Sequence, residues 1–274
     1  MQSFLKATKA VVLARGLGSR MRRLTPDAAL PPDQDRIASQ GIKGLVDVGR
    51  PLLDYALSNL ADAGIEQVCL VVGPEHDAII HRYRDTLRPA RLTITFAVQP
   101  EPRGTADAVL AAAGFAGPDP FLVVNSDNIY SVAALSALVS LGAPGLIGYD
   151  ATALFAASNI DPARFAQFAL IQTTPDALLS PIHENPSAAR RAPSAECRVS
   201  MNSWRFSPKI FDACRLVTPS PRGELELQDA VMIAMARFGE RFQVIPFAGG
   251  VLDLSSRADI AAVTDRLRGH QVRL

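Results

Sequence analysis

A glycine-rich turn followed by a cation is the first candidate for chemistry in this chain. The apolar run that starts at Ala10 predicts a buried strand, and Gly16 and Gly18 follow it in a turn. Glycine lets the backbone approach a ligand closely, and Arg20 just beyond the turn could meet phosphate oxygens. The run lacks the Lys-Ser/Thr ending of a P-loop and the third glycine of a dinucleotide fingerprint. It therefore predicts a phosphate site without identifying the ligand, and a turn without a ligand stays the alternative.

Two aspartates stand where apolar runs end. Asp127 follows the run at 121–124, and Asp253 lies in the run at 250–254 just before two serines. A carboxylate at the carboxyl edge of a sheet can hold a divalent ion over a phosphate. Each aspartate could instead cap the helix that follows it. The pair predicts a metal site, with two caps as the alternative.

A second turn could recognise a flat ring. Gln99 precedes Gly104 and Thr105, which open an alanine-rich helix. The glycine backbone could pack against a base, while the glutamine amide offers a donor and an acceptor to its edge. Most Gly-Thr helix starts are only caps, so this feature is weak by itself. Glu184, taken alone, is a surface-loop residue.

The order of elements predicts how these residues come together. Apolar strands at 68–72, 92–98, 121–124 and 145–149 alternate with helices in the first half. This alternation is typical of a mainly parallel sheet covered by helices on both faces. Ligands of such sheets bind outside the carboxyl ends of the strands. We therefore expect the glycine turn, Gln99 and Asp127 to converge.

The rest of the chain is predicted to continue the same fold. Residues 24–42 form a long polar connection, either a mobile lid or a surface excursion with a short helix. There is no internal repeat, so we treat residues 1–274 as one domain. The second half is expected to contain strands at 168–171, 199–206, 242–245 and 250–254, and helices from 207, at 226–238 and at 256–268.

Composition excludes several classes of function. Hydrophobic residues make up 48% and the net charge is +1, which leaves no basic surface for nucleic acid or an acidic membrane. The three cysteines have no paired spacing, which is typical of a reducing compartment. No apolar run reaches membrane-span length and no signal peptide is evident. We expect a cytoplasmic protein without nucleic-acid or membrane partners. The oligomeric state stays open, a homo-oligomer included.

The motifs also occur in a characteristic order. They are Gly-Leu-Gly-Ser-Arg at 16–20, Lys43 ahead of Gly49-Arg50-Pro51, Gln99 before Gly104-Thr105-Ala106, Asp127-Asn128, Glu184-x-Pro186, Asn202 and Asp253. Over about residues 9–260 this order resembles the sugar-1-phosphate nucleotidylyltransferases, the family of glucose-1-phosphate thymidylyltransferase and the uridylyltransferases. The resemblance implies an α/β, Rossmann-like and mostly parallel central sheet with helices on both faces, plus a smaller sugar-binding flank. It implies transfer of a nucleoside monophosphate from a triphosphate to a sugar 1-phosphate, with release of pyrophosphate.

The resemblance also implies roles for the residues that match the family's motifs. Residues 1–150 would form the nucleotide-binding half, and residues 151–274 would bind the sugar and complete the metal site. Catalytic roles fall on Arg20, Lys43 and Asp127, and a Mg²⁺ cofactor falls on Asp127 and Asp253. The sugar phosphate is expected at Asn128, Glu184 and Asn202. The nucleotide is expected at Leu13, Ala14, Gly16, Gly18, Ser19, Gln99, Gly104 and Thr105.

Two departures from the family pattern leave alternatives open. Arg15 stands where the family usually has a second glycine, which would put bulk or an extra cation beside the triphosphate. Asn185 stands where a lysine is expected on the sugar phosphate, and its replacements would be Arg190, Arg191 or Arg205. The acceptor could then be a cyclitol, heptose or aminoalkyl phosphate. A catalytically silent, nucleotide-sugar-binding regulatory homologue is the alternative from another class. Gln99 favours a pyrimidine, although a free amide can rotate to suit other bases.

Overall fold

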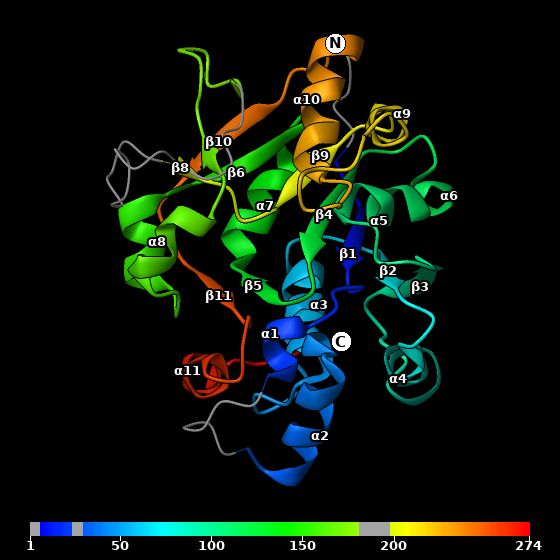
Figure 1. The fold of residues 1–274 in the computed structure, drawn as a ribbon, viewed down its shortest axis with the longest axis vertical. Coiled ribbons are helices and arrows are strands. Elements are labelled where there is room, and N and C mark those ends of the chain that lie inside the picture. Colours follow the sequence, from blue (N-terminus) through cyan, green and yellow to red (C-terminus); the bar gives the residue numbers. More distant parts are fainter. Residues whose placement is uncertain (1–5, 24–29, 181–197) are drawn as a thin grey trace.

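The strands of the first half pair in parallel around β1. The computed structural model describes residues 6–23, 30–180 and 198–274 (Figure 1). Strand β1 lies between β2 and β4, and β3 lies outside β2. Their bounds confirm the strands predicted from apolar runs: β1 (Lys9–Leu13), β2 (Gln67–Val72), β3 (Thr93–Val98) and β4 (Phe121–Asn125).

The second half extends the same sheet but makes it mixed. Strand β9 is inserted antiparallel between β4 and β6, and β10 pairs in parallel with β6. The prediction of one strand over 199–206 is wrong, because Asn202 takes a positive φ of 53° and interrupts it. Strand β6 (Gly145–Asp150) ends the first half, and the strands of the second half in this sheet are β7 (Leu170–Ile171), β8 (Arg198–Val199), β9 (Trp204–Phe206) and β10 (Gln243–Phe247).

Helices cover both faces of the sheet, as predicted. Side chains alternate along β1, so that Val12 packs into one core cluster and Val11 into the other. The first cluster lies beneath α3 (Leu52–Asp62) and α7 (Val132–Ser140). The second lies beneath α5 (Thr105–Ala111), α9 (Lys209–Cys214) and α10 (Leu227–Phe238), which pack on one another. The α/β fold with helices on both faces is confirmed.

The remaining elements lie around the carboxyl ends and flanks of the strands. Residues 24–29 of the connection at 24–42 lie outside the described residues, and the remainder contains a helix, α2, as expected for a surface excursion with a short helix. The alanine-rich helix predicted after Gly104 is divided into α5 and α6, and α4 is followed directly by η2. The further bounds are α1 (Ser19–Arg22), α2 (Pro32–Gln40), η1 (Lys43–Leu45), α4 (Asp77–Ile80), η2 (His81–Thr86), α6 (Ala113–Ala116), β5 (Asn128–Tyr130), α8 (Ala151–Ala157), η3 (Pro162–Gln167), β11 (Val251–Asp253) and α11 (Asp259–Leu267). In the part of the chain that the structure describes, no helix is long and apolar enough to span a bilayer.

A buried arginine joins the end of the chain to its beginning. The Arg257 side chain is only 2% exposed and lies between β11 and α11. Its Nε donates to the Met21 carbonyl at 3.0 Å, its Nη2 donates to Ser39 Oγ at 2.9 Å, and its Nη1 pairs with Asp35. Helices α1 and α2 are thereby held against the segment that follows Asp253.

This contact predicts a strong effect of a single substitution. Arg257→Met removes every donor and leaves the Met21 carbonyl without its buried partner. We expect the free energy of unfolding to fall by about 2–4 kcal/mol, measured by urea denaturation. Arg268→Met is the control, because the Arg268 side chain is 79% exposed and pairs with Asp265, one turn away on the surface. A loss of similar size in both variants would contradict the role given to Arg257.

Candidate active site

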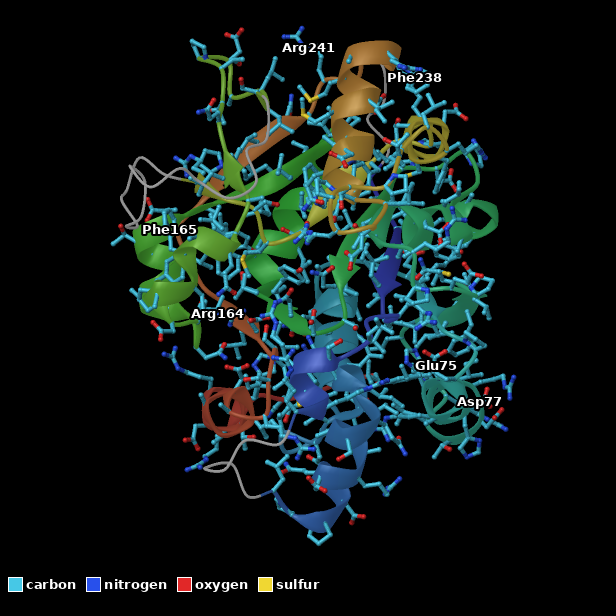
Figure 2. The ribbon with its side chains drawn as sticks, in the orientation of Figure 1. Glu75, Asp77, Arg164, Phe165, Phe238 and Arg241 are labelled. Carbon is cyan, nitrogen blue, oxygen red and sulfur yellow. The ribbon has the colours of Figure 1, made fainter. Side chains whose placement is uncertain are left out.

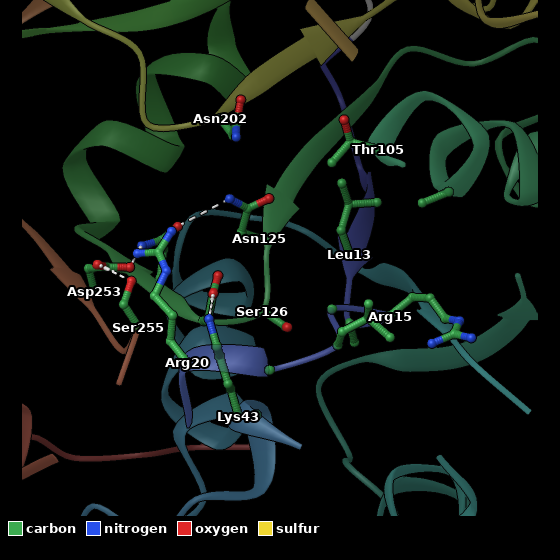
Figure 3. Close-up of a pocket in the computed structure, with 18 of the residues that line it drawn as sticks. Leu13, Arg15, Arg20, Lys43, Thr105, Asn125, Ser126, Asn202, Asp253 and Ser255 are labelled. Carbon is green, nitrogen blue, oxygen red and sulfur yellow. Dashed lines mark hydrogen bonds and ion pairs between the residues drawn. The ribbon is translucent and has the colours of Figure 1, made fainter. Parts of the chain in front are cut away.

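The predicted site residues line one cavity at the carboxyl ends of β1 and β4. Its volume is about 530 Å³, and both halves of the chain contribute to its walls (Figure 3). Glu184 lies outside the described residues. The predicted residues that line the cavity are Leu13, Ala14, Gly16, Gly18, Ser19, Arg20, Lys43, Gln99, Gly104, Thr105, Asp127, Asn128, Asn202 and Asp253. The predicted convergence is therefore confirmed, while the role of each residue stays a prediction.

The glycine loop at 16–18 forms part of the cavity wall next to Arg20. Its backbone continues the sheet, because Ala14 N donates to the Val71 carbonyl at 2.9 Å. Gly18 has a φ of +61°, and a Cβ there would overlap the Gly41 backbone. Only glycine fits this position without strain. Arg20 extends from the short helix α1 into the cavity with its side chain exposed.

Lys43 and Asp127 face each other across the cavity floor. Helix η1 carries Lys43, and its Nζ lies 2.8 Å from Asp127 Oδ2. The Lys43 side chain is 19% exposed and the Asp127 side chain is 26% exposed. The lysine therefore reaches the carboxyl edge of the sheet despite the long connection that precedes it in the sequence.

A two-stranded ribbon brings the second aspartate to the first. Strand β11 pairs antiparallel with β5, so that Asp253 lies opposite Asn128. The Asp253 carboxylate accepts from Asn128 Nδ2 at 3.2 Å, from Ser255 Oγ at 2.7 Å and from Arg164 Nη1 at 2.9 Å. Burial, and next the negative charge of Asp127, raise the pKa of Asp253, while Ser255 and Arg164 act against that rise.

The carboxylate oxygens of Asp127 and Asp253 are suitable ligands for a divalent cation. Mg²⁺ prefers oxygen ligands and is commonly held by one or two carboxylates together with substrate phosphates. Within residues 6–23, 30–180 and 198–274, no three Asp, Glu, His or Cys side chains lie close enough together to hold a metal ion. An ion held by Asp127 and Asp253 would have these two protein carboxylates and would take its other ligands from water or substrate. Lys43 and Arg164 balance one carboxylate each.

Gln99 and Thr105, which were predicted to bind the nucleotide, make hydrogen bonds within the protein. Gln99 is 2% exposed, and its Nε2 donates to the Gly104 carbonyl at 3.0 Å and to Asp107 Oδ2 at 2.8 Å. Thr105 Oγ1 accepts from Leu227 N at 2.9 Å and so anchors the start of α10. The Thr105 hydroxyl therefore has a hydrogen-bond partner within the protein, and Thr105 also lines the cavity.

Comparison with known proteins agrees with this geometry. The sequence profile described as nucleotidyl transferase matches residues 9–248. UTP–glucose-1-phosphate uridylyltransferase AglF of Haloferax volcanii is 31% identical over 261 residues, covering 95% of this chain and 96% of that protein. The chain belongs to the nucleotidyl transferase family. A glucose-1-phosphate thymidylyltransferase of Streptomyces antibioticus is 30% identical over 256 residues, covering 93% of this chain and 65% of that protein.

The fold agrees with a solved structure as well. A UDP-glucose pyrophosphorylase complexed with UDP-glucose matches with a TM-score of 0.73 and 18% identity, covering 97% of this chain and 100% of that one. At this identity the likeness concerns the fold alone. It confirms the nucleotide-diphospho-sugar transferase architecture expected from the sequence.

Arg15, the unusual arginine of this nucleotidyl transferase, lines the cavity, and two acceptors within the protein hold its guanidinium. Arg15 Nε donates to the Gln99 carbonyl at 3.1 Å, and its Nη1 donates to Glu75 Oε1 at 2.6 Å. Figure 3 shows its side chain extending away from Lys43 and Asn125. The guanidinium ties the glycine loop to the end of β3 and to the segment before α4. The expected bulk or extra charge beside the triphosphate stays a prediction.

Of the arginines predicted to replace the lysine missing at Asn185, the structure describes Arg205. Arg205 is 3% exposed and its Nη1 donates to the Val139 carbonyl at 2.9 Å, so it does not line the cavity. Arg190 and Arg191 lie outside the described residues. Arg164, which the sequence analysis missed, does line the cavity, and it lies on the side of α8 and β11 (Figure 2). It comes from η3, an element without a clear apolar period, so no local signal pointed to it.

The position of Arg15 predicts a separation of stability from ligand binding. Arg15→Met should lower the free energy of unfolding by about 1–3 kcal/mol through its lost charged hydrogen bonds. It should change the affinity for UTP less than about twofold, whereas Arg20→Met should lower it about tenfold or more. Urea denaturation and calorimetric titration measure the two quantities. An equal loss of affinity in both variants would show that Arg15 reaches the triphosphate.

The two carboxylates predict a coupled titration. Asp127→Asn removes the neighbouring negative charge, and this favours the ionised form of Asp253, so the pKa of Asp253 should fall. The pKa can be followed through the carboxyl ¹³C shift during an NMR pH titration. Asp265→Asn, at an exposed position on α11, should leave it unchanged. An unchanged pKa in Asp127→Asn would mean that the two charges do not interact.

Proposed function

We propose that this chain transfers a nucleoside monophosphate from a nucleoside triphosphate to a sugar 1-phosphate and releases pyrophosphate. The observation that carries the proposal is the pairing of β5 with β11, which places Asp127 and Asp253 in one cavity with Lys43 and Arg20. Relatives named as uridylyltransferase and thymidylyltransferase support the same reaction class. They also support a uridine or thymidine triphosphate as donor.

The chemistry requires two polyanions to meet. An oxygen of the acceptor phosphate attacks the α-phosphorus, the new P–O bond forms, and the bond to the β-phosphate bridge breaks as pyrophosphate leaves. A phosphate monoester is already ionised near neutral pH, so no covalent intermediate or general base is needed. Catalysis then rests on positioning and on charge stabilisation.

The residues that could supply this stabilisation lie on the nucleotide side of the cavity. Arg20, exposed on α1, would bind phosphate oxygens, and Lys43 would donate to them from the cavity floor. A Mg²⁺ ion held by Asp127 and Asp253 would add positive charge at the same place. The carboxylates and cations of a catalytic site are both present, which favours turnover over a silent binding protein.

The acceptor would enter from the side of the second half. Asn128 and Asn202 line that wall, and Gln228 Nε2 donates to Asn202 Oδ1 at 3.1 Å. Of the cations that line the cavity in the described chain, Arg164 alone comes from residues 151–274. We place the acceptor phosphate within reach of Arg164. A sugar 1-phosphate is the acceptor best supported by the named relatives, and other alcohol phosphates belong in the substrate panel.

Pyrophosphate release tests the proposal. The wild-type chain should release pyrophosphate from UTP or dTTP with a hexose 1-phosphate and Mg²⁺. Asp127→Asn and Asp253→Asn should each lower this rate about a hundredfold or more without large change in melting temperature. Asp265→Asn is the matched control and should keep full activity.

Each contrary result has a distinct meaning. Full activity in both site variants would overturn the metal assignment. Absence of pyrophosphate release by the wild type with any triphosphate and acceptor would overturn the reaction. Thermal stabilisation by nucleotide sugars without turnover would then favour the silent regulatory homologue.

A further inference from the structure

The amide of Gln99 is held in one orientation by two acceptors. Its Nε2 donates to Asp107 Oδ2 at 2.8 Å and to the Gly104 carbonyl at 3.0 Å. A carboxylate and a carbonyl can only accept, so the nitrogen end of the amide must face them. No group among the described residues donates a hydrogen bond to Gln99 Oε1. This oxygen belongs to a residue that lines the cavity.

Rotation of this amide would be costly. A half-turn would bring Oε1 against the Asp107 carboxylate and the Gly104 carbonyl, exchanging two hydrogen bonds for two repulsive contacts. Gln99 is 2% exposed, so water cannot readily replace the lost partners. These contacts oppose the rotation by which a free amide would suit other bases, and the choice of base stays a prediction. Because Nε2 is held by the protein, Oε1 is the end of the amide that is left to accept from a ligand.

The frame that holds these acceptors is itself rigid. Arg103 O accepts from Leu225 N at 2.7 Å, and Ala106 N donates to the Leu225 carbonyl at 2.8 Å. Gly104 has a φ of +121°, and a Cβ there would lie 2.5 Å from Leu225 N. Asp107 follows in the first turn of α5 and is partly buried. The Gly104 carbonyl and Asp107 thus stand at fixed positions beside Gln99.

We propose that Asp107 is a positioning residue that selects the base by locking the Gln99 amide with its oxygen toward the cavity. A locked acceptor favours a base with an imino N–H donor, which uracil and thymine carry at N3. Cytosine has the same ring size but an acceptor at N3, so it meets the Gln99 oxygen with repulsion. This inference rests on the proposed function, because it assumes that Gln99 contacts the base.

Substitutions at Asp107 test the lock. Asp107→Ala removes the charged acceptor, and the preference for UTP over CTP should fall about tenfold. Asp107→Asn keeps an acceptor oxygen for Gln99 Nε2 and should hold most of the preference, within about threefold of wild type. The measurement is kcat/KM for each triphosphate with one saturating acceptor, together with the affinity of each from calorimetry. Asp107→Leu, a second non-accepting variant, should behave as Asp107→Ala does.

The outcomes separate this inference from the proposed reaction. An unchanged UTP-to-CTP ratio in Asp107→Ala and Asp107→Leu would overturn the lock, and so would an equal loss for both nucleotides in all three variants. A wild type that prefers CTP would overturn the lock while leaving the reaction intact. A wild type that neither binds nor turns over any triphosphate would instead overturn the proposed function. Circular dichroism of each variant verifies that it is folded, and if neither non-accepting variant folds, Asp107 is a structural residue and the lock is overturned.

Discussion

The site depends on bringing two negative charges together at the end of a sheet. Strand β11 returns from the far end of the chain to pair with β5, and this pairing places Asp253 beside Asp127. Without a bound cation such an arrangement opposes folding, since burial and like charge both raise the pKa of Asp253. Lys43 and Arg164 offset the repulsion by pairing with one carboxylate each. The same arrangement would favour a divalent cation and the phosphates that accompany it.

Much of the surrounding structure keeps this arrangement in place. The buried Arg257 holds α1, which carries Arg20, against the segment that follows Asp253. Arg15 ties the glycine loop to the end of β3, and the Gly104 loop is bonded to the segment before α10. The cavity walls therefore come from segments far apart in sequence but are joined by buried hydrogen bonds. Rigid support of this kind is what charge stabilisation of a phosphoryl transfer requires.

Local sequence patterns predicted the strands and helices whose own residues show a clear apolar pattern. The run Val68–Val72 is apolar throughout because both faces of its strand are covered, and the structure contains a strand there. The short pieces near the site were missed for the opposite reason. Strand β5 has three residues and forms through its pairing with β11, and the predicted strand at 199–206 breaks at Asn202. Strands β5, β8 and β9 all pair with segments that are distant in sequence.

By itself the sequence determined which residue types were available and at which strand ends they would stand. Glycines after β1, Gln99 after β3 and Asp127 after β4 were predictable, because parallel strands bring their carboxyl ends to one edge. Only the tertiary structure decided what each side chain does there. It paired Arg15 with Glu75, buried Arg205 away from the cavity, brought Arg164 to the cavity wall and held the Gln99 amide nitrogen against Asp107. Hydrogen-bond partners distant in sequence set these orientations, and no local pattern carries that information.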